Sequence, residues 1–321
     1  MFRWRYSKPA ISRMPTTATI TRRLKLNDIR VLLAVVRAGS MSKAAAVLNT
    51  TQSAISRTIA DLENAIGARL LDRSAQGVEP TSSGRALLKR GIAVLDELEQ
   101  GVEEIKFLND PAAGELRIGA GPAQCEGIAL AVIAQLLRQY PRMIFHVAPL
   151  VTPPIYEELR QRRIEFGLVR ISGAMSEEDL EQEFLFEEPL VVVAHVDSPW
   201  ARRRKLDLRE LRDEAWTWPD ALDRFVVDAF RARRLEAPRA AVYTDASNMR
   251  TTLAATGRFL AVVPASVAQV SAMHAALKIL PVTLPAARLQ IGIVTVKNRT
   301  LSPMARLFID HTRKVVSAYR T

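Results

Sequence analysis

The chain of 321 residues is 48% hydrophobic and 25% charged, which is enough material for the cores of two or three domains. The net charge of +11 comes entirely from residues 1–90, which carry 16 Lys and Arg against 5 Asp and Glu, whereas residues 91–321 carry 29 of each. A single cysteine excludes an intrachain disulfide, the four scattered histidines lack metal-ligand spacing, and no apolar run approaches the roughly 20 residues that span a bilayer.

Residues 1–24 contain no acidic residue and are rich in Arg, Ser and Thr. This composition predicts a basic flexible arm, or upstream sequence ahead of a true start at Met14. The segment lacks the apolar core of a secretory signal, and the lone cysteine fits a reducing cytosol. A basic module on a neutral body favours attraction to nucleic-acid phosphates. The alternative is a basic disordered tail, because residues 1–26 alone supply seven of the excess positive charges.

Residues 27–65 are predicted to form three short helices. Asn27 or Asp28 can cap the first, Ser40 the second and Thr51 the third, because their side-chain oxygens can accept free N–H groups of a first helical turn. Each helix has apolar residues at helical spacing, which should face a shared core. These residues are Ile29, Leu32, Leu33, Val36, Ala44, Ala45, Leu48, Ile55, Ile59 and Leu62.

The outer face of the third helix begins with short or forked hydrogen-bonding side chains. They are Gln52, Ser53, Ser56 and Arg57. Such groups match the donors and acceptors of base edges, so this helix is typical of one that enters a DNA major groove. Many amphipathic helix pairs with Ala inside and Ser or Gln outside bind no DNA, and this segment alone leaves that alternative open.

A short hairpin is predicted to follow the three helices. Leu70 and Leu71 precede a turn containing glycine, and a second short strand ends before Pro80. Residues 25–80 are therefore predicted to form a winged helix-turn-helix domain. A wing beside a recognition helix commonly reaches a phosphate, which is the interpretation favoured for Arg73 over a solvated turn charge.

Thr81 is predicted to cap a long helix from about Ser82 to Leu108. Its apolar residues repeat every seven positions in two rows offset by three, which is the a/d seam of a short coiled coil. Residues 81–110 are therefore predicted to join two copies of the chain, with a buried surface helix as the alternative. The seam residues are Leu88, Leu95, Leu98, Val102 and Ile105.

From Glu115 onward, predicted strands and helices alternate, which indicates a parallel α/β sheet. The predicted strands are 116–119, 143–149, 166–171, 190–195, 240–243, 259–263 and 291–296, and the predicted helices are 128–140, 154–163, 206–213, 225–234, 245–256, 265–275 and 303–319. Residues 111–321 should form two lobes, about 111–187 with 290–321 and about 188–289. Ligands of such sheets bind at the carboxyl ends of strands, often in a cleft between lobes.

Residues 24–110 resemble the N-terminal module of LysR-type transcriptional regulators. The resemblance rests on Gly39, Ser40, Ala44, Ala45, Leu48, the run Thr51–Arg57, Ile59, Leu62, Glu63, Gly67, Leu70, Leu71, Arg73, Pro80, Thr81 and Gly84. The remainder is similar in layout to the family's effector-binding region, two α/β lobes like a periplasmic binding protein. The implied fold class is α/β with an all-α N-terminal part, a winged helix-turn-helix and a long linker helix.

The same resemblance implies roles for individual residues and partners. Base contacts would fall to Gln52, Ser53, Ser56 and Arg57, and phosphate contacts to Ser40, Thr51 and Arg73. It also implies a homodimer through the long helix, usually a tetramer, with double-stranded DNA and RNA polymerase as partners. A small effector bound between the lobes would change DNA bending. The protein would act in the bacterial cytoplasm, associated with the nucleoid. The resemblance implies no cofactor, no metal, no membrane contact and no catalytic residue.

The loop after the first strand of the effector region departs from the family pattern. Relatives usually supply Ser or Thr hydroxyls there for an anionic effector, whereas Gly119–Cys125 has none. A Gly-Ala-Gly-Pro loop is similar to that of family members linked to galactose-type sugar regulation. The candidate pocket residues are Pro122, Gln124, Thr152, Arg170 and Ser247.

Several residues also have structural interpretations. Arg170 could pair with a helix acid instead of a ligand, and a buried core position is favoured for Cys125 over an activated thiol at a helix start. Core packing is favoured for Trp216 and Trp218. Two rival functions are a solute-binding protein for a transporter and an enzyme on a bilobed fold. The missing signal segment opposes the first, and the sequence shows no catalytic carboxylate pair, phosphate loop or metal cluster for the second, so no enzyme is predicted.

Overall fold

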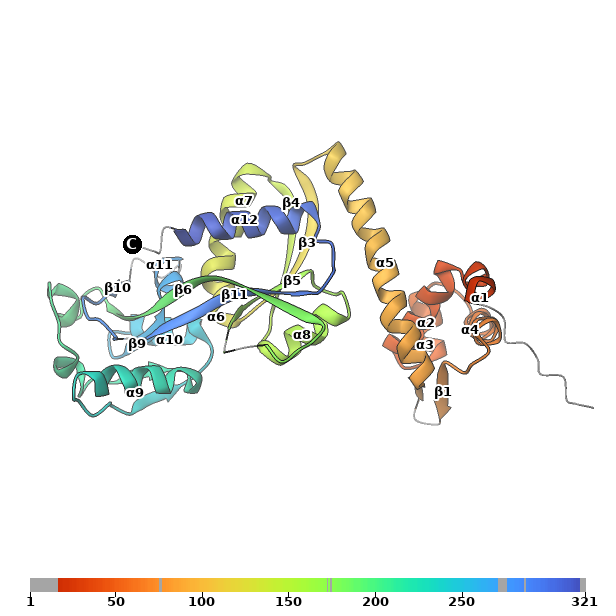
Figure 1. The fold of residues 1–321 in the computed structure, drawn as a ribbon. Coiled ribbons are helices and arrows are strands. Elements are labelled where there is room, and N and C mark those ends of the chain that lie inside the picture. The colour runs from red at the N-terminus through yellow and green to blue at the C-terminus, as the bar shows by residue number, and fades with distance from the viewer. Residues whose placement is uncertain are drawn as a thin grey trace, which may run out of the picture. The chain divides into compact units, whose positions relative to one another are not determined.

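The computed structural model describes residues 17–74, 77–171, 173, 175–270, 276–285 and 287–317. The chain divides into two compact units, Met1–Glu99 and Gln100–Thr321 (Figure 1). Helix α1, Thr17–Arg23, replaces the end of the predicted flexible arm, and the rest of the arm, residues 1–16, lies outside the described residues. The prediction of a flexible segment is therefore wrong for Thr17–Arg23.

The first unit contains the three predicted helices, which are confirmed. They are α2 (Leu26–Ala38), α3 (Met41–Val47) and α4 (Gln52–Ile66). The Ser40 and Thr51 side chains accept the backbone N–H groups of Lys43 and Ala54, at 3.5 and 3.2 Å, so both predicted caps are present. On the inner face of α4, Ile55, Ile59 and Leu62 are buried as predicted.

Two details of this core differ from the prediction. Helix α2 begins after Lys25, and the Asp28 carboxylate accepts the Lys25 N–H at 3.1 Å, so Asp28 lies in the first turn and does not precede the helix. Val31 and Val35 are buried in addition to Ile29 and Leu32, while Leu33 and Val36 are only partly buried. Leu48 is 37% exposed, because it lies at the C-terminal end of α3 where the chain turns toward α4.

The predicted wing is also confirmed. Strands β1 (Leu71–Ser74) and β2 (Gly77–Pro80) pair antiparallel, with Leu71 opposite Pro80. The Glu63 carboxylate near the end of α4 accepts the N–H groups of Leu70 and Leu71, at 2.7 and 3.2 Å. The N–H of Val78 donates to the Gly39 carbonyl at 3.0 Å. These bonds hold the wing against both α4 and the turn before α3.

The long helix α5, Ser82–Asn109, begins where the chain passes tightly over the wing. The Thr81 hydroxyl accepts the Gly84 N–H at 3.0 Å, which is the predicted cap. A Cβ at Gly84 would lie 2.0 Å from the Leu70 carbonyl oxygen, and this neighbour is backbone that cannot turn away. Only glycine therefore fits this close approach.

Substitution of this glycine should destabilise the first unit. We expect Gly84→Ala to cost about 1–3 kcal/mol, because the helix start must move away from Leu70. Faster hydrogen exchange across residues 26–85 of the full chain would measure it. Gly101→Ala is the matched control, since nothing described lies within 4 Å of a Cβ there and an exposed helix position should gain about 0.5–1 kcal/mol. Equal exchange in the two variants would contradict the packing argument.

The apolar residues of α5 divide between two faces. Leu88 and Leu95 are each 6% exposed, with Gly91 and Ile92 buried between them, so these two predicted seam residues pack within their own chain. The seam prediction is wrong for this pair, because the start of the helix completes the core of the first unit. A neighbouring row stays exposed, and its members are Val94, Leu98, Val102, Ile105 and Leu108.

The second unit is a mixed sheet and not the parallel sheet predicted. Its strands follow the order β4-β3-β5-β11-β6-β9-β7-β8, with β10 paired to β6. The strands are β3 (Ala113–Ala120), β4 (Arg142–Pro149), β5 (Phe166–Arg170), β6 (Leu180–His195), β7 (Trp216–Trp218), β8 (Ala240–Tyr243), β9 (Leu260–Pro264), β10 (Leu277–Ile279) and β11 (Arg288–Val296). Strand β3 is parallel to β4 and β5, whereas β6 and β11 run antiparallel to each other and to their other neighbours.

The long strand β6 belongs to both lobes. Through Pro189 it pairs with β11, and from Leu190 onward it pairs with β9 (Figure 1). The sequence predicted only its second half, because residues 180–189 are largely polar and alternate in burial. A single strand therefore passes from one lobe to the other and joins their sheets.

The helices of the second unit follow the prediction with changes at several ends, and the predicted helical residues 271–275 and 318–319 lie outside the described residues. They are α6 (Pro122–Gln124), α7 (Leu130–Gln139), α8 (Thr152–Arg160), α9 (Asp223–Ala232), α10 (Ser247–Ala255), α11 (Ala265–Val270) and α12 (Pro303–Ser317). A π-helical turn, Cys125–Ala129, joins α6 to α7, and only a 3-10 turn, Leu208–Leu211, forms in the predicted helix 206–213. Trp216 and Trp218 are fully buried with ring centroids 5.9 Å apart, so their predicted core role is confirmed.

Candidate DNA interface and candidate ligand cleft

The N-terminal end of α4 presents a polar face. Gln52, Ser53 and Arg57 are exposed and Ser56 is half-buried. Within the described part of the chain, no hydrogen bond occupies the Gln52 or Arg57 side chain, while Ser53 shares a 3.0 Å bond with the Thr51 hydroxyl. The buried side of the helix and the Thr51 cap fix the direction of this face. The Gln52 and Arg57 side chains are therefore available to a partner, with Ser53 and Ser56 beside them.

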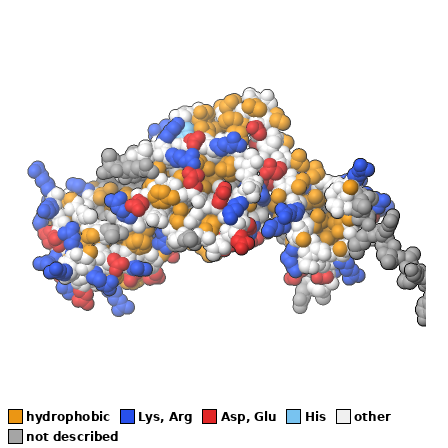
Figure 2. All heavy atoms as spheres, viewed as in Figure 1, with side chains coloured by type: hydrophobic (Ala, Val, Ile, Leu, Met, Phe, Trp, Pro, Cys, Tyr) orange, Lys and Arg blue, Asp and Glu red, His pale blue; other side chains and the backbone are white. Residues whose placement is uncertain are grey.

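The three residues predicted to contact DNA phosphates lie on three different elements of the first unit. Arg73 is exposed on β1 of the wing, and Ser40 and Thr51 begin α3 and α4. Each hydroxyl accepts a helix N–H, and the Thr51 hydroxyl also shares a hydrogen bond with Ser53. Hydroxyls at helix starts, together with the positive end of the helix dipole, suit a phosphate oxygen. Figure 2 shows Lys and Arg side chains exposed on this unit.

A cavity of about 270 Å³ lies in the second unit between the ends of its strands and helices. It brings together four of the five predicted pocket residues, namely Pro122, Gln124, Thr152 and Arg170. The other lining residues are Gly121, Ala123, Leu150, Val151, Val169, Pro219, Ala221, Leu222, Asp245, Arg250, Pro264 and Leu289. Gln124 is 5% exposed, and a Cβ at Gly121 would meet its Oε1 at 2.3 Å, so the missing side chain at Gly121 leaves room for the amide.

Ser247 was predicted to line the pocket, and this is wrong. It is fully buried, and its hydroxyl accepts a hydrogen bond from Nη2 of Arg250 at 2.9 Å. Arg250, one helical turn later on α10, takes its place in the wall of the cavity. The spacing of three residues was visible in the sequence, but which of the two faces a cleft depends on how α10 packs.

Arg250 is an unusually buried guanidinium. The residue is 1% exposed, and Nη1 donates to the Thr244 carbonyl at 2.7 Å. Among the described residues its Nε has no hydrogen-bond partner. Burial lowers the pKa of Arg250 to about 10, opposed by the nearby carboxylates of Glu126 and Asp245. The side chain therefore remains charged at neutral pH.

Arg170 ends β5 at another part of the cavity wall. Its Nη1 donates to the carbonyl of Ala221 at 3.3 Å, and this contact joins residues assigned to different lobes. The alternative prediction, a salt bridge with a helix acid, does not occur among the described residues. A guanidinium with one long bond to a carbonyl keeps most of its donors for a ligand.

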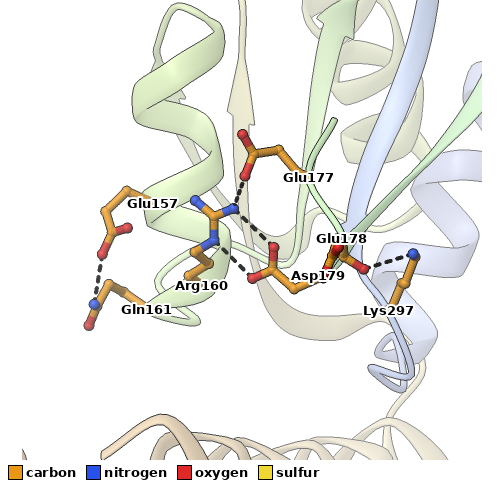
Figure 3. A network of polar contacts seen from close by, with 7 residues as sticks. All are labelled: Glu157, Arg160, Gln161, Glu177, Glu178, Asp179 and Lys297. Atoms are coloured by element: carbon orange, nitrogen blue, oxygen red, sulfur yellow. Dashed lines mark hydrogen bonds and ion pairs between the residues drawn. The ribbon is translucent and has the colours of Figure 1, made fainter. Parts of the chain in front are cut away.

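A second cavity of about 250 Å³ shares Thr152, Val169 and Arg170 with the first. An ion-pair network stands beside it (Figure 3). Arg160 of α8 donates two hydrogen bonds of 2.9 Å to the Asp179 carboxylate and also pairs with Glu177, and these carboxylates raise its pKa. This network ties the segment before β6 to α8, which supports one side of the cavities.

Cys125 opens the π-helical turn beside the cavity loop. Its Sγ donates to the Ala120 carbonyl at 3.4 Å, and burial raises its pKa to about 11. Below that pH the thiol stays protonated, and only the thiolate is strongly nucleophilic. The core interpretation fits this environment better than an activated thiol.

Alkylation kinetics test this assignment. At pH 8 we expect iodoacetamide to modify Cys125 in the folded chain at least about tenfold more slowly than in the urea-unfolded chain, because unfolding removes the burial that suppresses the thiolate. The unfolded chain is its own control, since it has the same single cysteine. A folded rate equal to or above the unfolded rate would show an activated thiol.

A winged helix-turn-helix, a long helix and a two-lobed α/β region with a cleft together define a DNA-binding regulator with a ligand-binding part. Two family models match the chain. The bacterial regulatory helix-turn-helix protein, lysR family, covers residues 26–85, and the LysR substrate binding domain covers residues 109–317. The chain belongs to the LysR family of transcriptional regulators.

Similar proteins span almost the whole chain. An uncharacterized HTH-type transcriptional regulator, YdcI of Escherichia coli (strain K12), is 28% identical and covers 94% of this chain and 99% of its own. The HTH-type transcriptional regulator GbpR of Azospirillum brasilense is 27% identical, covering 92% of this chain and 87% of its own. A crystal structure of full-length CbnR complexed with its target DNA shares the fold, with a TM-score of 0.52, 22% identity and coverage of 91% and 99%.

Two features are absent from the described residues. No helix there is long and apolar enough to cross a membrane. No group of three or more His, Cys, Asp or Glu side chains there could hold a metal ion.

Proposed function

We propose that this LysR-family regulator reads its operator with the exposed end of α4. The observation that carries the proposal is the set of polar side chains at the capped start of that helix, where Gln52 and Arg57 are exposed. Gln52 and Arg57 have the forked groups that pair with adenine and guanine edges, and Ser53 and Ser56 can donate or accept. Ser40, Thr51 and the wing residue Arg73 would hold the flanking phosphates and set the register.

The proposed assembly is a homodimer, paired further into a tetramer. Its contact surface is the exposed apolar row of α5, Val94, Leu98, Val102, Ile105 and Leu108. Figure 2 shows hydrophobic side chains lying open along this helix. Two copies of α4 would then meet two half-sites of a palindromic operator, since dimer symmetry and operator symmetry match.

The cleft around Pro122, Gln124, Thr152 and Arg170 is the proposed effector site. Its walls come from both lobes, so a ligand could change how the lobes sit on each other and thereby how the assembly bends DNA. RNA polymerase is the proposed downstream partner, and the cytoplasm with its nucleoid the proposed place of action. We propose that the protein has no catalytic activity. Turnover of any compound in a broad substrate panel would overturn this proposal.

A mobility-shift assay with the chain's own upstream region tests the proposal. We expect binding that survives moderate salt and excess unrelated DNA, because base contacts add to the salt-dependent phosphate attraction. The rival functions, a transporter's solute-binding protein and an enzyme, predict no specific complex. Absence of specific binding at moderate salt would overturn the proposal.

A further inference from the structure

We infer that the second lobe carries a separate site for a small phosphorylated molecule, in a cavity that Lys205 and Arg233 line. The cavity has a volume of about 440 Å³, and its walls come from residues 203–210, from Arg233 and from residues 281–283. It shares no lining residue with the two cavities beside Arg170. A ligand there would act apart from the proposed effector site, so the inference adds a second input to the proposed regulator.

Basic residues gather at this end of the second lobe. Residues 199–214 and 231–239 hold 10 Lys and Arg against 5 Asp and Glu, although residues 91–321 as a whole are balanced. The wider stretches 196–239 and 276–283 still hold 12 against 9. Figure 2 shows Lys and Arg side chains exposed at the end of the unit where Figure 1 places α9, with Asp and Glu between them. Such a local excess of positive charge attracts anions.

The two acids in the lining are occupied within the chain. The Glu210 carboxylate pairs with Arg203 at 2.8 Å and accepts the Asp207 N–H at 2.9 Å. The Asp207 carboxylate accepts the Arg209 N–H at 2.9 Å. Together the two acids form the capping box of the 3-10 turn Leu208–Leu211, so they hold the loop that carries the cations.

Two cations of the lining keep their charge for a partner. In the part of the chain that the structure describes, the Lys205 and Arg233 side chains make no hydrogen bond and no ion pair, and both residues are exposed. Lys205 lies in the loop after β6 and Arg233 directly after α9, yet both line one cavity. A phosphate monoester carries about two negative charges at neutral pH and three acceptor oxygens. An ammonium and a guanidinium together match that charge.

The rest of the wall suits a small polar molecule. The Leu206 N–H donates to the Pro281 carbonyl at 3.2 Å, and the Leu206 and Leu208 side chains are buried, so the loop is anchored from below. Thr283 adds a neutral hydroxyl to the wall. The volume lies within the roughly 300–1,000 Å³ of small-molecule pockets. A DNA duplex presents a convex backbone, so a concave site favours a small phosphate ester over DNA.

Matched probes with and without phosphate test the inference on the full chain. Ribose 5-phosphate is compared with ribose, and adenosine 5′-monophosphate with adenosine, by titration calorimetry at constant ionic strength. We expect at least one of the two esters to bind with a Kd in the millimolar range or lower, and its unphosphorylated partner not to bind. Equal binding within each pair, or binding by neither ester, would overturn the inference.

Paired charge-removing variants locate the bound phosphate. Lys205→Gln/Arg233→Gln should weaken the ester at least about tenfold, because charge-assisted hydrogen bonds are lost. Its Tm should stay at the wild-type value, since both side chains are exposed. Arg204→Gln/Arg234→Gln is the matched control, because these exposed neighbours lie outside the lining, and it should keep the wild-type affinity. Equal affinity in the two double variants would place the phosphate elsewhere and overturn the inference.

Operator binding by the same preparations separates this site from the proposed DNA interface. Without ester, Lys205→Gln/Arg233→Gln should bind operator DNA as tightly as the wild type and with the same salt dependence. Loss of operator affinity in a chain that binds no ester would assign this surface to the DNA backbone and overturn the inference. A chain that binds esters but no operator keeps this site and removes the proposed regulator function.

Discussion

Replacing Leu98 and Ile105 by glutamate is expected to convert the assembled protein to a monomer. Both side chains lie on the exposed apolar row of α5, with 47% and 61% of their surface open in the single chain. Charges placed in a helix–helix contact must be desolvated without partners, which costs several kcal/mol in two copies at once. Sedimentation velocity of Leu98→Glu/Ile105→Glu should therefore give the mass of one chain.

The control for this prediction is Glu104→Lys. This residue is exposed on the same helix and outside the apolar row, so the assembly should survive although the charge change is of equal size. Hydrogen exchange of residues 26–85 should be the same in both variants, because neither position packs in the first unit. An unchanged mass for the double glutamate variant would remove α5 from the proposed interface.

Loss of operator preference is the second large effect we expect, from Gln52→Ala combined with Arg57→Ala. Each base contact is worth about 1–3 kcal/mol of discrimination, and a dimer loses it in both half-sites. Specific affinity should fall at least about 100-fold and approach the affinity for unrelated DNA. Competition binding with operator and scrambled duplexes of equal length measures the change.

Arg73→Ala gives the contrasting result in the same assay. A phosphate contact carries no sequence information, so its loss should weaken binding to both duplexes alike and reduce the salt dependence. Neither variant should change stability, because Gln52, Arg57 and Arg73 are exposed. A double variant that still prefers the operator by the wild-type ratio would place base recognition elsewhere on the protein.

The first unit was largely predictable from sequence because its information is local. Helix caps act within three residues, and the periodic apolar residues Ile55, Ile59 and Leu62 define one buried face without knowledge of the rest of the chain. The prediction was wrong where a distant element decides burial. Leu88 and Leu95 repeat as a dimer seam would, yet both are buried within the single chain, and Leu88 packs in the core of the first unit. Gly91 lies against Ile29 on the same side of the helix.

The second unit was predictable in its elements and less so in their pairing. Strand positions follow from short apolar runs, but strand direction depends on connections between distant segments, so the antiparallel course of β6 and β11 was not visible. Arg250 was missed for a similar reason. Its sequence neighbourhood resembles any polar helix start, and its burial appears only when α10 packs beside the cleft.

The most direct test of base recognition by α4 is selection of bound duplexes from a random-sequence library. The wild-type chain should enrich one motif with dyad symmetry, because in the proposed dimer two copies of α4 would contact two half-sites. Gln52→Ala/Arg57→Ala should retain DNA through phosphate contacts but enrich no such motif. Enrichment of the same motif by both proteins would contradict base recognition by α4.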